Sequence, residues 1–148
     1  MKIGAQIPEF PLKDRNGTSI SSHSFIGKKK VVVYFYPKDE TKVCTAQACA
    51  FRDSFQDFLD LGCEVIGISS DSDERHQQFM SRHKLPFILV SDPQKEIRKL
   101  FGVPKDVFGL LPGRYTYIFN RDGILIKIFH AAFNANAHIT TALDVLSN

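Results

Sequence analysis

The sequence predicts an α/β sandwich built on a mixed sheet. Segments rich in β-forming residues alternate along the chain with segments whose apolar residues recur at helical spacing. Near the end of the chain, two apolar segments surround an Asp122-Gly123 turn. Alternating strands and helices are typical of parallel strands joined by crossover helices, whereas an Asp-Gly turn closes an antiparallel hairpin. The sheet should therefore combine both kinds of pairing.

The N-terminal part is expected to form a hairpin followed by a central strand. Residues 10–14 and 18–20 flank Asn16-Gly17, a dipeptide that favours a tight turn. Residues 31–36 are consecutive apolar β-formers, and Pro37 ends the run. An unbroken apolar run of this kind is typical of a strand that is buried on both faces.

A helix should follow this strand. Its apolar residues recur every three or four positions and so share one face. They are Cys44, Ala48, Phe51, Phe55, Phe58 and Leu59. Two further strands are expected at residues 64–69 and 87–90. Between them, Asp71 with Glu74 three residues later resembles a capping box that opens a helix reaching about Arg82.

The C-terminal part should hold a helix, the Asp-Gly hairpin and a closing helix. Asp92 is suited to the N-cap and Pro93 to the first helical position, while Gly102 is suited to end that helix. The two hairpin strands and the closing helix are expected at residues 115–119, 124–129 and 136–146.

The composition is that of one globular domain, which we expect to span residues 1–148. Hydrophobic residues make up 43% of the chain and charged residues 24%, which excludes disorder for most of it. The net charge of +3 is too small and too scattered to predict a nucleic-acid partner. No apolar stretch approaches the roughly 18 residues of a membrane span, and the N-terminus has neither signal-peptide nor transit-peptide character. We therefore expect a soluble, cytoplasmic protein.

The three cysteines, Cys44, Cys49 and Cys63, are too few for a disulfide scaffold. In a reducing compartment, such cysteines are catalytic, metal-binding or packed in the core. The five histidines form no closely spaced pair with one another or with a cysteine, so we expect no metal and no cofactor.

Cys44 has a position that suits a nucleophile. It follows the most buried strand and lies in the first turn of the next helix, where unpaired backbone N–H groups and the helix dipole favour an anion. A thiolate there would be reactive at neutral pH. The alternative is that Cys44 only begins the apolar stripe with which it is in phase.

Cys49 lies five residues further along the same helix. Ideal helix geometry separates the two Cα atoms by about 8.6 Å, whereas a disulfide requires less than about 7 Å. If these thiols ever pair, the first turns of the helix must therefore unwind. Two thiols at this spacing suggest redox chemistry, although Cys49 could also be a simple packing residue.

This segment resembles the peroxiredoxins, which are cysteine-based thiol peroxidases. The pattern Pro37-x-x-x-Thr41-x-x-Cys44 is similar to their signature loop, and Cys44 to Asp53 resembles the bacterioferritin-comigratory-protein, or peroxiredoxin Q, branch. The resemblance continues near both ends, at Gly4 to Leu12 and at Arg114 to Gly123. It implies a thioredoxin-like fold with an N-terminal hairpin extension.

The resemblance also implies a role for each residue of the motif. Cys44 would attack the peroxide and become a sulfenic acid, and Cys49 would resolve it as an intramolecular disulfide. Thr41 would hold the thiolate and orient the peroxide, or simply cap the helix. Pro37 would shield Cys44 besides ending the strand. Arg114 would stabilise the thiolate and the departing oxygen, unless it is only a surface residue.

Two residues are assigned no catalytic role. Arg121 lies in the expected hairpin turn, and Cys63 is expected to pack at a strand start. The resemblance further implies hydrogen peroxide or organic hydroperoxides as substrates, thioredoxin or a similar dithiol as reductant, and a monomer.

Other functions fit the sequence less well. A thioredoxin-type oxidoreductase would have Cys-x-x-Cys, and the Pro37, Thr41 and Cys44 arrangement disfavours a glutathione-peroxidase-like enzyme. A cysteine hydrolase would need a histidine near Cys44 in space. A redox sensor using the same disulfide stays open, and it would differ from an enzyme in consuming only one equivalent of peroxide.

Overall fold

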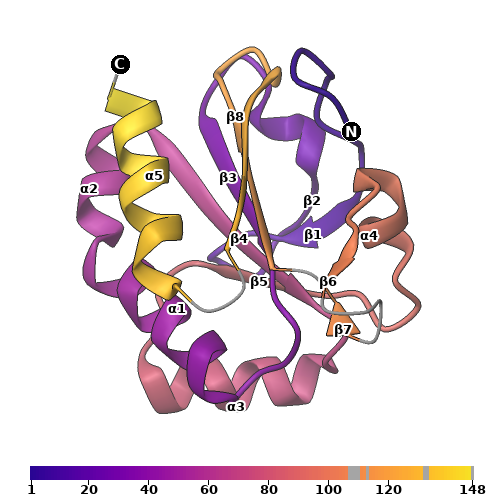
Figure 1. Ribbon diagram of the computed structural model, residues 1–148, viewed down its shortest axis with the longest axis vertical. Coiled ribbons are helices and arrows are strands. Elements are labelled where there is room, and N and C mark those ends of the chain that lie inside the picture. The colour runs from indigo at the N-terminus through magenta and orange to yellow at the C-terminus, as the bar shows by residue number, and fades with distance from the viewer. Residues whose placement is uncertain (107–110, 113, 132–133, 148) are drawn as a thin grey trace.

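A five-stranded mixed sheet forms the centre of the computed structural model, which describes residues 1–106, 111–112, 114–131 and 134–147. The strand order is β5-β4-β3-β8-β9 (Figure 1). Strands β3, β4 and β5 are parallel, while β8 runs antiparallel to both β3 and β9. The strands are β3 (Lys30–Phe35), β4 (Cys63–Ser69), β5 (Ile88–Ser91), β8 (Tyr115–Phe119) and β9 (Leu125–His130). The expected mixed sheet is confirmed.

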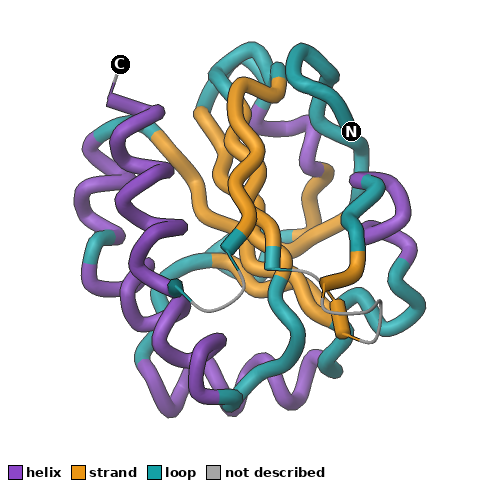
Figure 2. Tube along the Cα trace, in the orientation of Figure 1, coloured by secondary structure: helices purple, strands orange, loops and turns teal. Residues whose placement is uncertain are grey.

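Helices and small hairpins surround this sheet (Figure 2). The helices are α1 (Lys42–Asp53), α2 (Phe55–Asp60), α3 (Asp73–His83), α4 (Glu96–Phe101), α5 (Ala135–Ser147) and the 3₁₀ turn η1 (Ser22–Phe25). The hairpin strands outside the sheet are β1 (Pro11–Lys13), β2 (Ser19–Ser21), β6 (Lys105–Asp106) and β7 (Leu111–Pro112). The N-terminal hairpin was expected, whereas the short β6–β7 pair was not. None of the helices in the described part of the chain is long and apolar enough to cross a membrane.

Side chains of β3 alternate between two hydrophobic cores, as a strand buried on both faces requires. Val32 and Tyr34 point into the core that α1, α2 and α5 cover. Val33 and Phe35 point into the opposite core, which contains residues of the N-terminal segment and of α4. Figure 1 shows α1, α2 and α5 together on one side of the sheet and α4 on the other.

Most boundaries agree to within about one residue, and three helical features differ from the sequence-based expectation in a way that has a clear cause. The helix expected from Cys44 to Leu59 is interrupted at Ser54, which has non-helical ψ and ends α1 while beginning α2. The residues Phe51 and Phe55 on either side of the break still enter the same core, so apolar spacing alone could not reveal it.

The other two differences concern helix starts. Ser72, not Asp71, caps α3, because its side chain accepts the N–H of Arg75. Helix α4 begins at Glu96, later than expected, after Lys95 in a left-handed conformation. Asp92 nevertheless accepts the N–H groups of two residues of α4, Ile97 and Arg98, so it contributes to capping from a greater distance.

Candidate active site

Strand pairing brings the distant parts of the candidate site together. The loop of residues 36–41 follows β3 and leads into α1. Strand β8 is antiparallel to β3, and its first residue, Tyr115, pairs with Phe35 at the end of β3. The residue before it, Arg114, therefore lies near the C-terminal end of β3, where the loop that leads into α1 starts.

Cys44 and Arg114 meet in the interior of the protein. Their exposed fractions are 1% and 4%. Arg114 Nη2 donates to Cys44 Sγ at 3.2 Å, and Arg114 Nη1 donates to Gln47 Oε1 at 2.6 Å. A buried cation thus lies against the sulfur, where the low local dielectric strengthens its attraction for a thiolate.

Thr41 and Pro37 occupy the loop before α1. Thr41 is the N-cap residue of α1, but its hydroxyl makes no capping bond and donates to the carbonyl of Lys38 at 2.8 Å. The side chain of Thr41 is exposed and Pro37 is half-buried. The Thr41 hydroxyl therefore does not cap α1.

The other cysteines differ in their surroundings. All three thiols are free, and Cys49 is half-buried on α1, five residues after Cys44. Cys63 is buried at the start of β4, and its Sγ donates to the carbonyl of Glu64. Burial, with a smaller effect of the Glu64 charge, raises the pKa of the Cys63 thiol to about 12. Because only a thiolate is a good nucleophile, Cys63 is unreactive at neutral pH.

Tyr34 of β3 and Tyr36, which directly follows β3, belong to the same hydrophobic core as Cys44. Tyr34 stacks on Phe51 and on Tyr36, with ring centroids 4.6 and 5.4 Å away. Burial raises the pKa of Tyr34 well above its usual value, and the neighbouring Cys44 charge raises it further. Tyr34 is therefore neutral.

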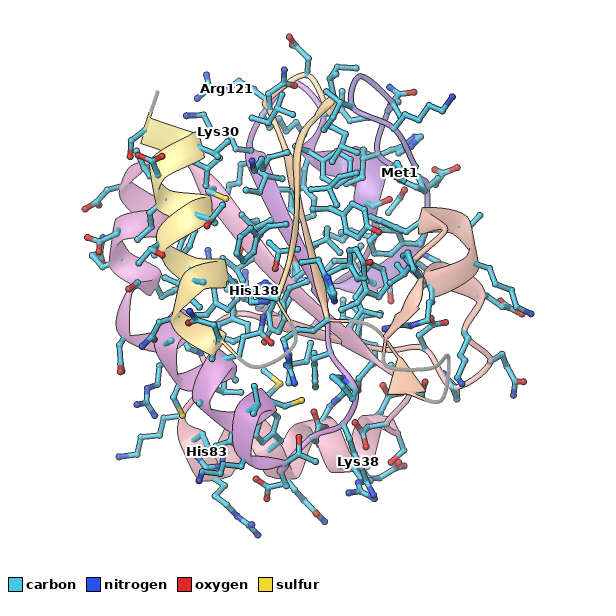
Figure 3. All side chains as sticks on the ribbon, viewed as in Figure 1. Met1, Lys30, Lys38, His83, Arg121 and His138 are labelled. Atoms are coloured by element: carbon cyan, nitrogen blue, oxygen red, sulfur yellow. The ribbon has the colours of Figure 1, made fainter. Side chains whose placement is uncertain are left out.

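Arg121 is remote from this group. Figure 3 shows it at the opposite end of the molecule from Lys38, whose carbonyl accepts the Thr41 hydroxyl. The preference for Arg114 over Arg121 thus agrees with the geometry.

Gln47 belongs to the site but was not singled out from the sequence. It is completely buried, and within the described part of the chain its Nε2 has no hydrogen-bond partner. Its position three residues after Cys44 places both on one face of α1, which is a spacing that could have drawn attention to it.

A second group that was missed lies behind the loop. Asp39, Asp71 and His76 are buried, and one ligand-type atom from each lies within 4.8 Å of the others, so among the described residues they could hold a metal ion. The carboxylate oxygens of Asp39 and Asp71 already accept hydrogen bonds from the protein, however. The Tyr36 hydroxyl donates to Asp39, and Asp71 accepts the Asp39 N–H.

Comparison with known proteins agrees with this architecture. Residues 3–128 match the model of the AhpC/TSA family. The chain belongs to this family, the peroxiredoxins, and is a thiol peroxidase.

Its relatives place it more narrowly. It is 48% identical to the chloroplastic peroxiredoxin Q of Sedum lineare over 98% of this chain and 77% of that protein. It is also 48% identical to the Arabidopsis thaliana chloroplastic peroxiredoxin Q, over 97% of this chain and 66% of that protein. It is therefore a member of the peroxiredoxin Q, or bacterioferritin-comigratory-protein, branch.

Solved structures support the same fold. The peroxidoxin BcpB of Mycobacterium tuberculosis aligns with a TM-score of 0.86 and 30% identity, over 99% of this chain and 97% of that chain. The bacterioferritin comigratory protein of Xanthomonas campestris aligns with a TM-score of 0.82 and 26% identity, over 93% of this chain and 90% of that chain. The thioredoxin-like fold with its N-terminal hairpin is confirmed.

Proposed function

We propose that Cys44 is the peroxidatic cysteine of a single-domain peroxidase spanning residues 1–148. The Cys44 thiolate attacks one oxygen of the peroxide and the O–O bond breaks. The sulfur becomes a sulfenic acid, and the other oxygen leaves as water or an alcohol after taking a proton. The single observation that supports this most is the 3.2 Å contact between Arg114 Nη2 and Cys44 Sγ inside a buried site.

The surrounding residues have complementary roles in this proposal. Arg114 stabilises the thiolate and the charge that develops on the leaving oxygen. Thr41, an exposed residue directly before α1, orients the peroxide through its hydroxyl, which in the reduced protein donates to the Lys38 carbonyl. Pro37 shields the sulfur from solvent on the loop side.

Cys49 then resolves the sulfenic acid. Its thiolate attacks the Cys44 sulfur and the S–O bond breaks, so that an intramolecular disulfide forms. The oxygen leaves as hydroxide and becomes water by taking up the proton that the Cys49 thiol had lost. Both cysteines lie within the intact helix α1, where ideal geometry keeps their Cα atoms about 8.6 Å apart. Resolution therefore requires the first turns of α1 to unwind.

A dithiol reductant, thioredoxin or a similar protein, returns the disulfide to two thiols. The substrates we propose are hydrogen peroxide and organic hydroperoxides, and the alkyl peroxide reduction activity of the related Xanthomonas campestris protein supports the second. We further propose a monomer in the cytoplasm, although the plant relatives are named chloroplastic.

The decisive experiment measures peroxide consumption with thioredoxin and its reductase, together with free thiols before and after one equivalent of peroxide. We expect many turnovers and the loss of two thiols per chain. Cys44→Ser should abolish consumption while the protein stays folded, and retention of more than a few per cent of the activity would overturn the assignment. A protein that consumes a single equivalent would be a sensor instead.

A further inference from the structure

A buried hydrogen-bond network holds the loop of residues 36–41 from behind. Asp39 lies at its centre, with an exposed fraction of 1%. The Tyr36 hydroxyl donates to Asp39 Oδ1 at 2.5 Å, and Asp39 Oδ2 contacts His76 Nδ1 at 2.5 Å. The loop is thereby tied to α3, which supplies His76.

Both ring nitrogens of His76 are engaged in this network. Its Nδ1 faces the Asp39 carboxylate, and its Nε2 lies 3.1 Å from the carbonyl of Val90 on β5, which can only accept. Because the carbonyl only accepts, His76 Nε2 must carry a proton to bond it. A second proton must lie between His76 Nδ1 and Asp39 Oδ2 for that contact to be a hydrogen bond as well. The pair therefore links the loop to β5 through α3.

Asp71 fixes the loop backbone at the same point. Its Oδ2 accepts the N–H of Asp39 at 2.7 Å and the hydroxyl of Ser69 at 2.7 Å. Its Oδ1 forms an ion pair with Arg75 of α3. Both the backbone and the side chain of Asp39 are thus anchored.

The next residue of the loop, Glu40, makes a second and more exposed set of contacts with α3. Glu40 has a φ of 65°, a left-handed conformation that is uncommon for a residue with a side chain. Its carboxylate pairs with Arg82 and with His83 Nε2, both of α3. Two consecutive residues of the loop are therefore held by one helix, so the loop conformation is over-determined.

We propose that Asp39 and His76 are positioning residues for the peroxidase reaction. The inference rests on the proposed roles of Cys44 and Thr41. The network holds the loop that carries Thr41, whereas Arg114 reaches Cys44 from just before β8, on the other side of β3. Loosening the network should therefore disturb the orientation of the peroxide and leave the thiolate with its cation.

This separation gives a sharp test. In a Cys49→Ser, Cys63→Ser background, Cys44 is the single thiol, and its reactions with hydrogen peroxide and with iodoacetamide can be measured side by side. Only the first needs an oriented peroxide. We expect Asp39→Ala to slow the peroxide reaction by about 10- to 100-fold, because small misplacements of positioning groups have effects of this size. Iodoacetamide should react at the same rate or faster.

The conservative variant should restore the rate. In Asp39→Asn, the amide oxygen can still accept from Tyr36, and the amide N–H can donate to Nδ1 of a neutral His76 that keeps its bond to Val90. We expect its peroxide rate to stay within about threefold of the parent, since the geometry is preserved. If Asp39→Ala does not fold, Tyr36→Phe removes one bond to the same carboxylate, and we expect a smaller but selective loss of peroxide rate.

Ser22→Ala is the matched control. Ser22 is completely buried and bonds the N-terminal segment at Phe10 N–H and the Pro8 carbonyl, away from the loop. It should lower stability and leave both rates unchanged. An unchanged peroxide rate in folded Asp39→Ala, or an equal fall of both rates, would overturn the inference. Activity that survives Cys44→Ser would instead overturn the proposed function.

Discussion

The guanidinium of Arg114 bridges Cys44 and Gln47, which lie on successive turns of α1. Its Nη2 donates to Cys44 Sγ at 3.2 Å and its Nη1 to Gln47 Oε1 at 2.6 Å. Gln47 is neutral, so it orients the guanidinium without cancelling its charge. The positively charged guanidinium thus lies against the sulfur in a buried site.

Arg114→Met should slow the reaction of Cys44 with peroxide by about 100- to 1000-fold, the usual effect of losing one preorganised donor in an active site. Arg114→Lys should give an intermediate rate, because an ammonium keeps the charge but cannot contact Cys44 and Gln47 as a planar fork. Stopped-flow measurement of single-turnover oxidation checks both values. Arg121→Met is the control and should react normally. If Arg121→Met were the damaging change, the assignment of Arg114 would be wrong.

Gln47→Leu should impair the site through Arg114. It removes the acceptor of Nη1, and a buried donor left without this partner costs about 1–3 kcal/mol of stability. We expect the peroxide rate to fall about tenfold, because a misplaced guanidinium stabilises the transition state less well. Gln47→Glu keeps the acceptor but adds a negative charge that competes with the Cys44 thiolate for Arg114, so its peroxide rate should fall as well. Equal rates for Gln47→Leu and the parent would show that Arg114 is positioned without Gln47.

The sequence predicted the fold well where local patterns determine structure. The apolar run of residues 31–36 and the Asp122-Gly123 turn identified a central strand and an antiparallel hairpin, and both exist as β3 and the β8–β9 pair. The break at Ser54 was missed because Phe51 and Phe55 enter one core with or without it. Apolar periodicity reports which face of a helix is buried, not whether the helix is continuous.

The site was predictable only in part. Thr41, Cys44 and Cys49 are neighbours in sequence, so their spacing was visible, and their proposed roles stay predictions. Arg114 was suggested by family resemblance, since nothing local indicates that it meets a thiol 70 positions away. The contact of Asp39 with His76 joins residues 37 positions apart and depends on the packing of α3 against the sheet. Long-range polar contacts of this kind leave no periodic signal.

His138 should make the protein less stable in mild acid. Burial, followed by the smaller effect of the Arg114 charge, outweighs the bond to the Ala131 carbonyl and lowers the His138 pKa to about 4. The Thr116 hydroxyl bonds its Nδ1, and its Nε2 bonds Ala131. An unfolded chain binds a proton near pH 6.5, whereas the folded one binds it only near pH 4. Stability from this residue is thus fully present above pH 6.5 and is lost as the pH falls toward 4, by at most about 3 kcal/mol.

Urea unfolding at several pH values measures this loss. His138→Gln does not titrate, and its amide can accept from Thr116 and donate to Ala131. It should therefore lose less stability than the parent between pH 7 and pH 4. His23→Gln is the control, because His23 lies in η1 and its side chain is 37% exposed, whereas His138 is completely buried. Parallel pH profiles for His138→Gln and the parent would contradict the prediction.

The last prediction concerns helix α1 during the catalytic cycle. In the reduced protein α1 is helical from Lys42 to Asp53 and contains both cysteines. Pairing them requires a Cα separation below about 7 Å, against about 8.6 Å in the intact helix. The buried Phe51, Phe55 and Phe58 should anchor the later turns, so unwinding should stop before them.

Amide hydrogen exchange tests this directly. Amides between Thr41 and Ala50 should exchange markedly faster in the Cys44–Cys49 disulfide form than in the reduced form, because their helical hydrogen bonds are lost. The core residues that follow should keep their protection in both forms. Cys49→Ser is the control: it should react once with peroxide, remain helical, and accumulate sulfenic or over-oxidised Cys44, since no nearby thiol resolves it. Equal protection of the segment in both redox states, or a disulfide that involves Cys63, would exclude unwinding of α1 as the route to resolution.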